Sequence, residues 1–325
     1  MSARPGLADV EDAAARLEGI AVATPLLACP ALDEIAGGRV LLKPECLQRT
    51  GSFKIRGAYN LMSRLSDAER AAGVVAFSSG NHAQGVAAAA RLLGLHAAIV
   101  MPEDAPSAKI ENTRRLGGET VLYDRYSGDR EQIARALAAE RGAALVPSYD
   151  HAHIIAGQGT VGLEIARDLE ATPPDQVLVC CSGGGLIAGC AIALRGLHPD
   201  CAVWAVEPEG FDDTARSLAA GARVRNDESA RGICDALQVL TPGALTFEIN
   251  RELLAGGLVV SEAEVRAAMR FAFRELKLVV EPGGAVALAA VLAGRIDCRD
   301  RLTVVVLSGG NVDPALYAEI QREEG

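Results

Sequence analysis

Short runs of strand-forming residues alternate along the chain with longer stretches rich in alanine and leucine. Six such runs occur, at residues 73–77, 96–101, 119–123, 176–181, 201–207 and 301–307. Strands that alternate with helical stretches predict βαβ units, and nearly continuous apolar strands predict sheets covered by helices on both faces. We therefore expect an α/β protein with mostly parallel sheets.

The chain is long enough to form two lobes. At 325 residues it can hold two domains that share an interface. The segment 73–147 contains a strand and helix series of its own, with turn-forming residues at both sides. We expect it to form a small lobe inserted into a large lobe made of residues 1–72 and 148–325. Each lobe is expected to be an open, mostly parallel sheet covered by helices.

Composition limits the kind of partner. The net charge is −10, and lysine and arginine do not cluster with aromatic residues, so we expect a small-molecule substrate and no nucleic-acid partner. Residues 1–17 include acids and no apolar stretch, so we expect no secretory signal. Ser-Gly-Gly-Gly interrupts the uncharged run 177–194, which favours strand, turn and helix over a membrane span. Eight cysteines without a CxxC pair fit a reducing compartment, so we expect a cytoplasmic protein with no membrane partner.

Three polar, glycine-rich segments directly follow predicted strands, at residues 78–82, 182–185 and 308–311. In open parallel sheets, ligands bind beyond the carboxyl ends of the strands, where such loops meet. We therefore expect the three segments to converge in a cleft between the lobes, which is the predicted active site.

A fourth segment, residues 50–58 (TGSFKIRGA), places Lys54 between a small polar turn and an apolar helix. A lysine amine in that position can form a Schiff base with an aldehyde cofactor. Taken alone, a lysine at a helix start is more often a solvated surface group. The cofactor interpretation therefore depends on the three segments downstream.

The segment 182–186 (SGGGL) follows an apolar strand and opens an apolar helix. The backbone N–H groups of Gly183, Gly184 and Gly185 can approach a phosphate there, because glycine lacks a Cβ and a helix N-terminus attracts anions. A tight turn without a ligand is the alternative. The GxGxxG spacing does not occur cleanly, so a nicotinamide-dependent dehydrogenase fits poorly.

The segment 78–85 (SSGNHAQG) also follows a strand and opens a helix. This arrangement places a hydroxyl, an amide and an imidazole, from Ser79, Asn81 and His82, at the edge of the cleft. The alternative is that Ser79 and Asn81 only cap the helix.

In this order, the four segments resemble those of the fold-type II pyridoxal-phosphate enzymes, and within them the serine/threonine dehydratase and serine racemase branch. The resemblance runs from about Thr24 to Asp313, and SFKIRGA is the dehydratase form of the lysine motif. It implies the two-lobed fold of the tryptophan synthase β type, pyridoxal 5'-phosphate as the cofactor, and a homodimer.

The resemblance also implies cofactor contacts for individual residues. Lys54 would be joined to the cofactor aldehyde, Phe53 would flank the pyridoxal ring, and Asn81 would bind the ring 3-hydroxyl. The further implied contacts are the backbone amides of Gly183, Gly184, Gly185 and Leu186 with the phosphate, and the hydroxyl of Ser308 with the pyridine nitrogen. A serine hydroxyl leaves that nitrogen largely unprotonated, which suits a rapid elimination.

Substrate contacts are implied for one loop. Ser78, Ser79, Gly80, Asn81 and His82 would hold the substrate carboxylate. In this branch the serine that matches Ser79 lies on the ring face opposite the lysine, so protons can be exchanged from both sides. Lys54 and Ser79 are therefore the predicted catalytic residues.

Two charged residues, Glu281 and Arg130, each allow a functional and a purely structural interpretation. Glu281 resembles an active-site acid of the family that contacts the cofactor region, but a glutamate before Pro282 and a helix start is equally explained as a solvated charge. Arg130 falls near a position where the racemase branch has an arginine that faces the substrate. An arginine on a surface helix is the more ordinary interpretation.

The segment 205–213 (AVEPEGFDD) resembles the divalent-cation site of the family. Glu207 and Asp213 would supply carboxylates, and Phe211 a backbone carbonyl. Oxygen ligands completed by water suit Mg²⁺ or Ca²⁺. A helix start enriched in acids is the alternative.

The resemblance implies an ammonia-lyase, or dehydratase, that eliminates the β-hydroxyl of an L-amino acid and releases a 2-oxo acid and ammonia. Residues 232–243 depart from the run common in threonine dehydratases, so threonine, serine and 3-hydroxyaspartate stay open as substrates. The nearest alternative is a racemase of serine or another hydroxy amino acid, with Lys54 and Ser79 as bases on opposite faces. A protein that binds the cofactor without turnover is the alternative from another class, and the intact set of lysine, serine and glycine residues argues against it.

Overall fold

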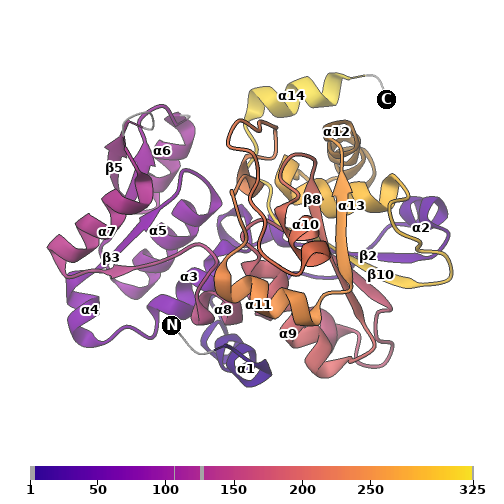
Figure 1. Cartoon of the computed structure of the whole chain (residues 1–325), viewed down its shortest axis with the longest axis horizontal. Coiled ribbons are helices and arrows are strands. Elements are labelled where there is room, and N and C mark those ends of the chain that lie inside the picture. Colours follow the sequence, from indigo (N-terminus) through magenta and orange to yellow (C-terminus); the bar gives the residue numbers. More distant parts are fainter. Residues whose placement is uncertain (1–3, 106, 125–127, 324–325) are drawn as a thin grey trace.

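The computed structural model describes residues 4–105, 107–124 and 128–323, and its strands form two separate sheets (Figure 1). The larger sheet has the strand order β1-β2-β10-β7-β8-β9, and the smaller has the order β5-β4-β3-β6. All neighbouring strands are parallel except β1 and β2. The strands are β1 (Leu27–Ala28), β2 (Arg39–Pro44), β3 (Val74–Phe77), β4 (Ala97–Pro102), β5 (Glu119–Tyr123), β6 (Ala144–Leu145), β7 (Gln176–Cys180), β8 (Ala202–Pro208), β9 (Gly256–Val260) and β10 (Leu302–Leu307).

The six apolar runs of the sequence all form strands, so the prediction of an α/β fold with mostly parallel sheets is confirmed. Runs 73–77, 96–101 and 119–123 become β3, β4 and β5 of the small sheet, and the other three lie in the large sheet. Four strands had no prediction. Two of them, β1 and β6, have only two residues, β2 contains a lysine, and β9 begins with two glycines, so none of the four is a long apolar run.

Helices cover both sheets, and the two lobes lie side by side (Figure 1). Ser66 and Ser261 each form a capping box at the start of a helix. None of the described helices has the length and apolarity needed to cross a bilayer. The α-helices are α1 (Leu7–Arg16), α2 (Pro30–Ala36), α3 (Lys54–Met62), α4 (Asp67–Ala72), α5 (Asn81–Leu93), α6 (Ser107–Arg115), α7 (Arg130–Arg141), α8 (Ala152–Asp168), α9 (Gly185–Leu197), α10 (Asp213–Ala220), α11 (Ala244–Leu253), α12 (Glu262–Phe271), α13 (Pro282–Leu292) and α14 (Pro314–Arg322). The shorter helices are η1 (Glu45–Leu47), η2 (Arg49–Gly51), η3 (Asp235–Leu237) and the π-helix η4 (Ala272–Leu276).

Glycines hold α8 directly against α9. A Cβ on Gly159 would lie 2.7 Å from the carbonyl oxygen of Gly189, and a Cβ on Gly189 would lie 2.3 Å from the carbonyl oxygen of Ile155. Any larger residue at either position would therefore push the two helices apart. Because α9 begins at the glycine loop 183–185, this contact also fixes the position of that loop.

The helix that begins at Lys54 packs with the small sheet. Ile55 and Met62 of α3 are fully buried in one apolar cluster with Val74 of β3 and Ile99 of β4. The lysine is therefore the first residue of a helix whose apolar face belongs to the small-lobe core. The lobe boundaries at residues 73 and 147 stay a prediction, because a shared apolar cluster does not define where a domain begins.

A buried network of charged side chains surrounds Arg56, near the start of α3. The Arg56 guanidinium is fully buried and donates to Glu45 at 2.7 and 2.8 Å and to Glu164 at 2.5 and 3.0 Å. Lys43 of β2 also contacts Glu164, at 2.7 Å. Burial raises the pKa of Glu45, but Arg56 and the Thr24 hydroxyl more than offset this, so its pKa lies below the ordinary value. The network joins β2, η1, α3 and α8.

The substitution Arg56→Met tests this network. It leaves the buried carboxylate of Glu45 without its partner, so we expect the free energy of unfolding to fall by about 3–5 kcal/mol. Urea unfolding at pH 7 measures the change. The matched control is Arg299→Met, which removes an exposed ion pair with Asp297 and is expected to change stability little. Equal stability of the two variants would show that the network does not support the fold.

Candidate active site

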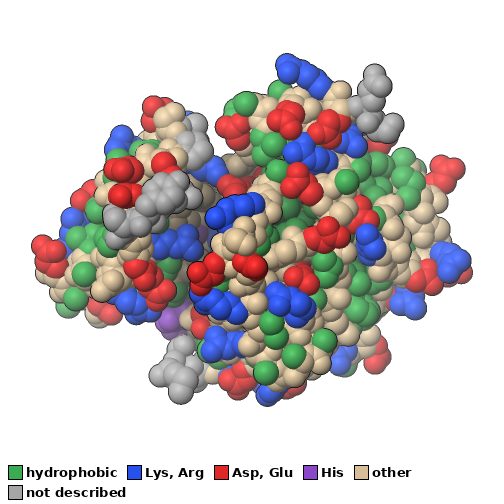
Figure 2. Space-filling model, turned by 45° about the horizontal axis from the view of Figure 1, so that its top comes forward, with side chains coloured by type: hydrophobic (Ala, Val, Ile, Leu, Met, Phe, Trp, Pro, Cys, Tyr) green, Lys and Arg blue, Asp and Glu red, His purple; other side chains and the backbone are tan. Residues whose placement is uncertain are grey.

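A cavity of about 590 Å³ lies between the lobes, and all four sequence segments reach it. Its volume is typical of small-molecule sites. Lysine and arginine side chains lie on both sides of the boundary between the lobes (Figure 2). The predicted residues that line the cavity are Phe53, Lys54, Ser78, Ser79, Gly80, Asn81, His82, Gly183, Gly184, Gly185, Leu186, Glu281 and Ser308. The structure thus brings together every predicted cofactor and substrate residue, whose individual roles stay predictions.

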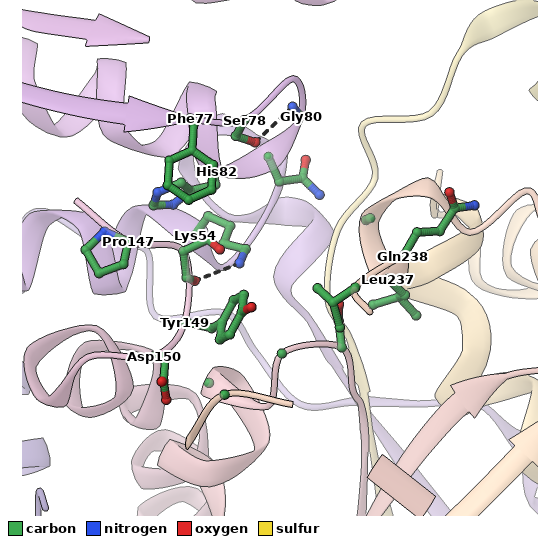
Figure 3. Close-up of a pocket in the computed structure, with 18 of the residues that line it drawn as sticks. Lys54, Phe77, Ser78, Gly80, His82, Pro147, Tyr149, Asp150, Leu237 and Gln238 are labelled. Atoms are coloured by element: carbon green, nitrogen blue, oxygen red, sulfur yellow. Dashed lines mark hydrogen bonds between the residues drawn. The ribbon is translucent and has the colours of Figure 1, made fainter. Parts of the chain in front are cut away.

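Lys54 is the first residue of α3, and its amine reaches into the cavity (Figure 3). Its Nζ donates to the carbonyl oxygen of Ser148 at 3.0 Å and lies 5.1 Å from the centre of the Phe53 ring. Burial lowers the pKa of Lys54 to about 8, although Cys180 and Glu281 act in the opposite direction. A substantial fraction of this amine is therefore neutral near physiological pH, as a nucleophile or a base requires.

The loop 308–311 holds the backbone that leads to Lys54. Asn311 donates to the carbonyl oxygen of Thr50 at 2.8 Å, and the N–H of Phe53 donates to the carbonyl oxygen of Ser308 at 3.2 Å. Thr50 has a φ of 68°, which is rare for a β-branched residue. Such a conformation persists only where surrounding contacts impose it. The loop after β10 supplies those contacts and so sets the position of the lysine.

Asn81 and the buried Glu281 form a hydrogen-bonded pair at the cavity wall. Asn81 Nδ2 donates to Glu281 Oε1 at 2.5 Å, and Asn81 Oδ1 accepts from Asn311 at 2.7 Å. Glu281 is only 3% exposed, so it is not the solvated helix-end charge of the alternative interpretation. Burial and the nearby Asp235 raise the pKa of Glu281 to about 7, while the Asn81 hydrogen bond opposes the shift. The carboxylate therefore orients the amide of Asn81.

The loop 183–185 has no room for side chains. A Cβ would lie 2.4 Å from the Tyr149 ring at Gly183, 2.7 Å from the Asn250 amide at Gly184, and 2.7 Å from Gln158 Oε1 at Gly185. Among the described residues, no side chain caps α9, so its first N–H groups stay available to an anion. The arrangement can hold a phosphate group through the backbone.

The polar side chains of the loop 78–82 differ in their hydrogen bonds. Ser78 Oγ accepts the N–H of Gly80 at 3.2 Å, and Ser79 lines the cavity. The His82 imidazole lies 2.9 Å from the carbonyl oxygen of Val146. Burial, with the Lys54 charge adding to it, lowers the pKa of His82 to about 3. His82 is therefore neutral and donates to Val146, so its side chain anchors the loop and does not carry positive charge to a substrate.

Sequence reasoning missed several cavity residues. Tyr149 and Asp150 line the cavity, and the Asp150 carboxylate accepts three N–H groups at the start of α11 at 2.9, 2.9 and 3.0 Å. The buried Gln158 donates to the carbonyl oxygen of Ser148 at 3.3 Å, while its Oε1 has no partner among the described residues. Tyr149 and Asp150 stand just before the segment 154–160 (IIAGQGT), and Gln158 lies within it, but nothing in the sequence alone marks them as cavity residues. Arg130 is exposed, as on an ordinary surface helix, yet it lines the cavity, and its guanidinium lies 5.9 Å from the centre of the Phe77 ring.

The segment predicted to bind a cation lies at the start of α10. Glu207 is fully buried, and its two oxygens accept the N–H groups of Thr214 and Ala215 at 3.0 and 2.8 Å. One Asp213 oxygen accepts from Asn226 at 2.6 Å, and the other has no partner in the described chain. Burial raises the pKa of Glu207 to about 8 and of Asp213 to about 6. No group of three or more His, Cys, Asp or Glu side chains suited to a metal occurs within residues 4–105, 107–124 and 128–323, and the predicted set has only two.

Comparisons with known proteins agree with this geometry. The family model described as "Pyridoxal-phosphate dependent enzyme" matches residues 18–309. An L-threo-3-hydroxyaspartate ammonia-lyase of a Pseudomonas species is 49% identical over 96% of this chain and 97% of its own length. A serine racemase of Schizosaccharomyces pombe is 40% identical over 97% of this chain and 96% of its own. The solved structure of threonine deaminase isoform 2 from Solanum lycopersicum, in its processed form, has a TM-score of 0.91 and 35% identity, and the match covers 97% of this chain and 86% of that one.

The buried Glu281 makes the stability of the protein depend on pH. Its pKa in the folded protein is raised, so its stabilising contribution is complete below about pH 4.5 and is lost as the pH rises through about 7. Between pH 5 and pH 8 we expect the free energy of unfolding of the wild type to fall by about 2–3 kcal/mol more than that of Glu281→Gln. Urea unfolding of both proteins at the two pH values measures this difference. Parallel pH profiles would contradict the shifted pKa.

Proposed function

Since this chain belongs to the pyridoxal-phosphate-dependent enzymes, we propose that it is an ammonia-lyase that converts a β-hydroxy L-amino acid to a 2-oxo acid and ammonia. The observation that carries the proposal is the position of Lys54, whose amine has a lowered pKa and lies in the same cavity as the glycine loop 183–185. The curated relatives named as ammonia-lyases make the enzyme class a carbon–nitrogen lyase.

The cavity fits pyridoxal 5'-phosphate. When bound, the cofactor draws electrons away from the substrate Cα and makes its hydrogen acidic. Lys54 would hold the aldehyde group covalently, and Phe53 beside it would flank the ring. The remaining proposed contacts are the amide of Asn81 with the 3-hydroxyl, the hydroxyl of Ser308 with the pyridine nitrogen, and the backbone of Gly183, Gly184, Gly185 and Leu186 with the phosphate. Glu281 acts on this site through its 2.5 Å hydrogen bond, which fixes the orientation of the Asn81 amide.

The chain's own groups are suited to bind the substrate and to move its protons. The loop 78–82 ends at the start of α5, where backbone N–H groups attract a carboxylate. With a pKa of about 8, the amine of Lys54 is neutral often enough to remove the Cα proton. Ser79 would face the opposite side of the substrate, where a second proton can be exchanged.

Among the three candidate substrates we favour 3-hydroxyaspartate. A positive charge would stabilise its second carboxylate, and Lys109, Arg130 and Arg135 all line the cavity. Lys109 and Arg135 are paired there with Asp235 and Glu131. The curated relative at 49% identity is named for this substrate. Racemisation is the second candidate function, because Lys54 and Ser79 both line the cavity and a relative at 40% identity is named serine racemase.

We also propose a Mg²⁺ or Ca²⁺ ion at the start of α10. Two buried carboxylates, Glu207 and Asp213, stand close enough for Asp213 to raise the pKa of Glu207, and one Asp213 oxygen lacks a partner in the described chain. A hard cation would satisfy both charges, with the backbone carbonyl of Phe211 as a further oxygen ligand.

A cytoplasmic homodimer completes the proposal, and light scattering after gel filtration tests the dimer.

A substrate panel tests the main proposal. The enzyme with pyridoxal phosphate is incubated with L-threo-3-hydroxyaspartate, L-threonine and L-serine, and 2-oxo acid, ammonia and D-isomer are measured. We expect 2-oxo acid and ammonia as the main products, with the highest kcat/KM for 3-hydroxyaspartate. Lys54→Ala is expected to be inactive, while the exposed Lys277→Ala is the matched control. Abundant D-isomer without 2-oxo acid would establish the racemase instead.

Cation binding is tested by thermal unfolding in chelator and in added Mg²⁺ or Ca²⁺. A ligand at 100 times its Kd stabilises the folded state by about 2.7 kcal/mol, so the wild type is expected to melt at a higher temperature with the cation. Asp213→Asn removes one ligand charge and is expected to lose most of this increase. A control, Asp297→Asn, alters an exposed carboxylate outside the site and is expected to keep it. No increase in the wild type would contradict the site.

A further inference from the structure

Elimination of a β-hydroxyl needs an acid as well as a base, because hydroxide leaves far more readily once it is protonated. Several proton-bearing groups of the cavity are poorly suited to this task. The His82 imidazole is hydrogen-bonded to the carbonyl oxygen of Val146, and Glu281 accepts a hydrogen bond from Asn81. The Cys180 thiol is buried, and its pKa is raised to about 11. Tyr149 lines the same cavity, and its phenol has no such hydrogen bond within the described chain.

Tyr149 lies between Lys54 and the glycine loop. Its ring atoms are 2.4 Å from the place where a Cβ on Gly183 would be, and its own Cβ is 2.9 Å from the corresponding place at Gly185. The preceding residue, Ser148, accepts the hydrogen bond of the Lys54 amine. In Figure 3 the ring and the Lys54 amine both reach into the cavity, and the Tyr149 hydroxyl is directed toward the loop that carries Leu237. The phenol therefore lies in the same cavity as the base, on the wall formed by the glycine loop.

The backbone at Tyr149 is clamped on its C-terminal side. The carboxylate of Asp150 accepts the N–H groups of Ala244, Leu245 and Thr246, so it acts as a cap of α11 from a distant part of the chain. A Cβ on Gly243 would lie 2.4 Å from Asp150 Oδ1, so only glycine leaves room for this contact. With its backbone held and its ring against Gly183, Tyr149 presents its hydroxyl in a defined direction.

We propose that Tyr149 donates the proton that the departing β-hydroxyl group requires. The proposal rests on the ammonia-lyase function above. The phenol makes no hydrogen bond with any residue of the described chain, so its proton is free to be donated. Burial, to which the Asp150 charge adds, raises the pKa of Tyr149 above its ordinary value, although Arg130 opposes the shift. The group is therefore protonated at neutral pH.

The step conserves atoms and electrons. Lys54 takes the Cα proton, and the electron pair of that bond forms the Cα–Cβ double bond. The Cβ–O bond breaks with its pair on oxygen, the Tyr149 proton binds to that oxygen, and water leaves. The Tyr149 phenolate then recovers a proton from the Lys54 ammonium, which restores both residues. No oxidant or additional reactant is needed.

Tyr149→Phe, made in the enzyme with its cofactor, separates acid catalysis from packing. Phenylalanine keeps the ring on Gly183 and removes only the hydroxyl. With L-threo-3-hydroxyaspartate, L-threonine or L-serine, whichever the wild type turns over best, we expect kcat to fall by about 10²–10⁴-fold. With β-chloro-L-alanine we expect little change, because chloride leaves without a proton. Tyr59→Phe, on α3 but not on the cavity wall, is the matched control and is expected to behave as the wild type.

Exchange of the Cα hydrogen with deuterated water supplies a second measurement. If Tyr149 acts only on the leaving group, the exchange persists in Tyr149→Phe with the hydroxy substrate. Equal losses with hydroxyl and chloride leaving groups, or loss of the exchange, would show a structural role and overturn the proposal. Unchanged turnover of the hydroxy substrate would assign the acid to another group and also overturn it. A wild type that forms no 2-oxo acid from any hydroxy amino acid would instead refute the ammonia-lyase function itself.

Discussion

The buried pairing of Arg56 with Glu45 and Glu164 is the constraint on which the rest of the structure depends. Removing these charges from water is costly, and only their simultaneous contact compensates for it. The contact requires η1, α3 and α8 to be in place together, and Lys43 ties β2 to the same carboxylate. Since Arg56 is two residues after Lys54, the same geometry that satisfies the charges also sets where the Lys54 amine projects.

Around that point, the two lobes supply different parts of the chemistry. The small lobe contributes the loop after β3, with its hydroxyls and the start of α5. The large lobe contributes the glycine loop after β7 and the loop after β10. Each of these follows the carboxyl end of a parallel strand, so the cavity forms where the ends of two sheets face each other. The helix that carries Lys54 packs into the small-lobe core but is held at its start by the large lobe, and it therefore joins both parts.

Local patterns were enough to predict six of the ten strands of the described chain and the four segments that meet in the cavity. Apolar runs of strand length reveal β3, β4, β5, β7, β8 and β10, while a short strand such as β6 is made by pairing with a neighbour and leaves little trace in the sequence. Glu281 illustrates a second limit. The proline after it marks a helix start, but its hydrogen-bond partner, Asn81, lies 200 positions earlier in the chain. The role of Asp150 depends in the same way on α11, about 95 positions later.

The backbone turn at Thr50 has a consequence for how the enzyme is made. This threonine adopts a left-handed conformation that it would not keep alone, and its carbonyl is held by Asn311, 261 positions away. A polypeptide still emerging from the ribosome therefore contains the lysine long before it contains the clamp that positions it. The backbone geometry that leads to Lys54 can therefore form only after the loop 308–311 has been synthesised.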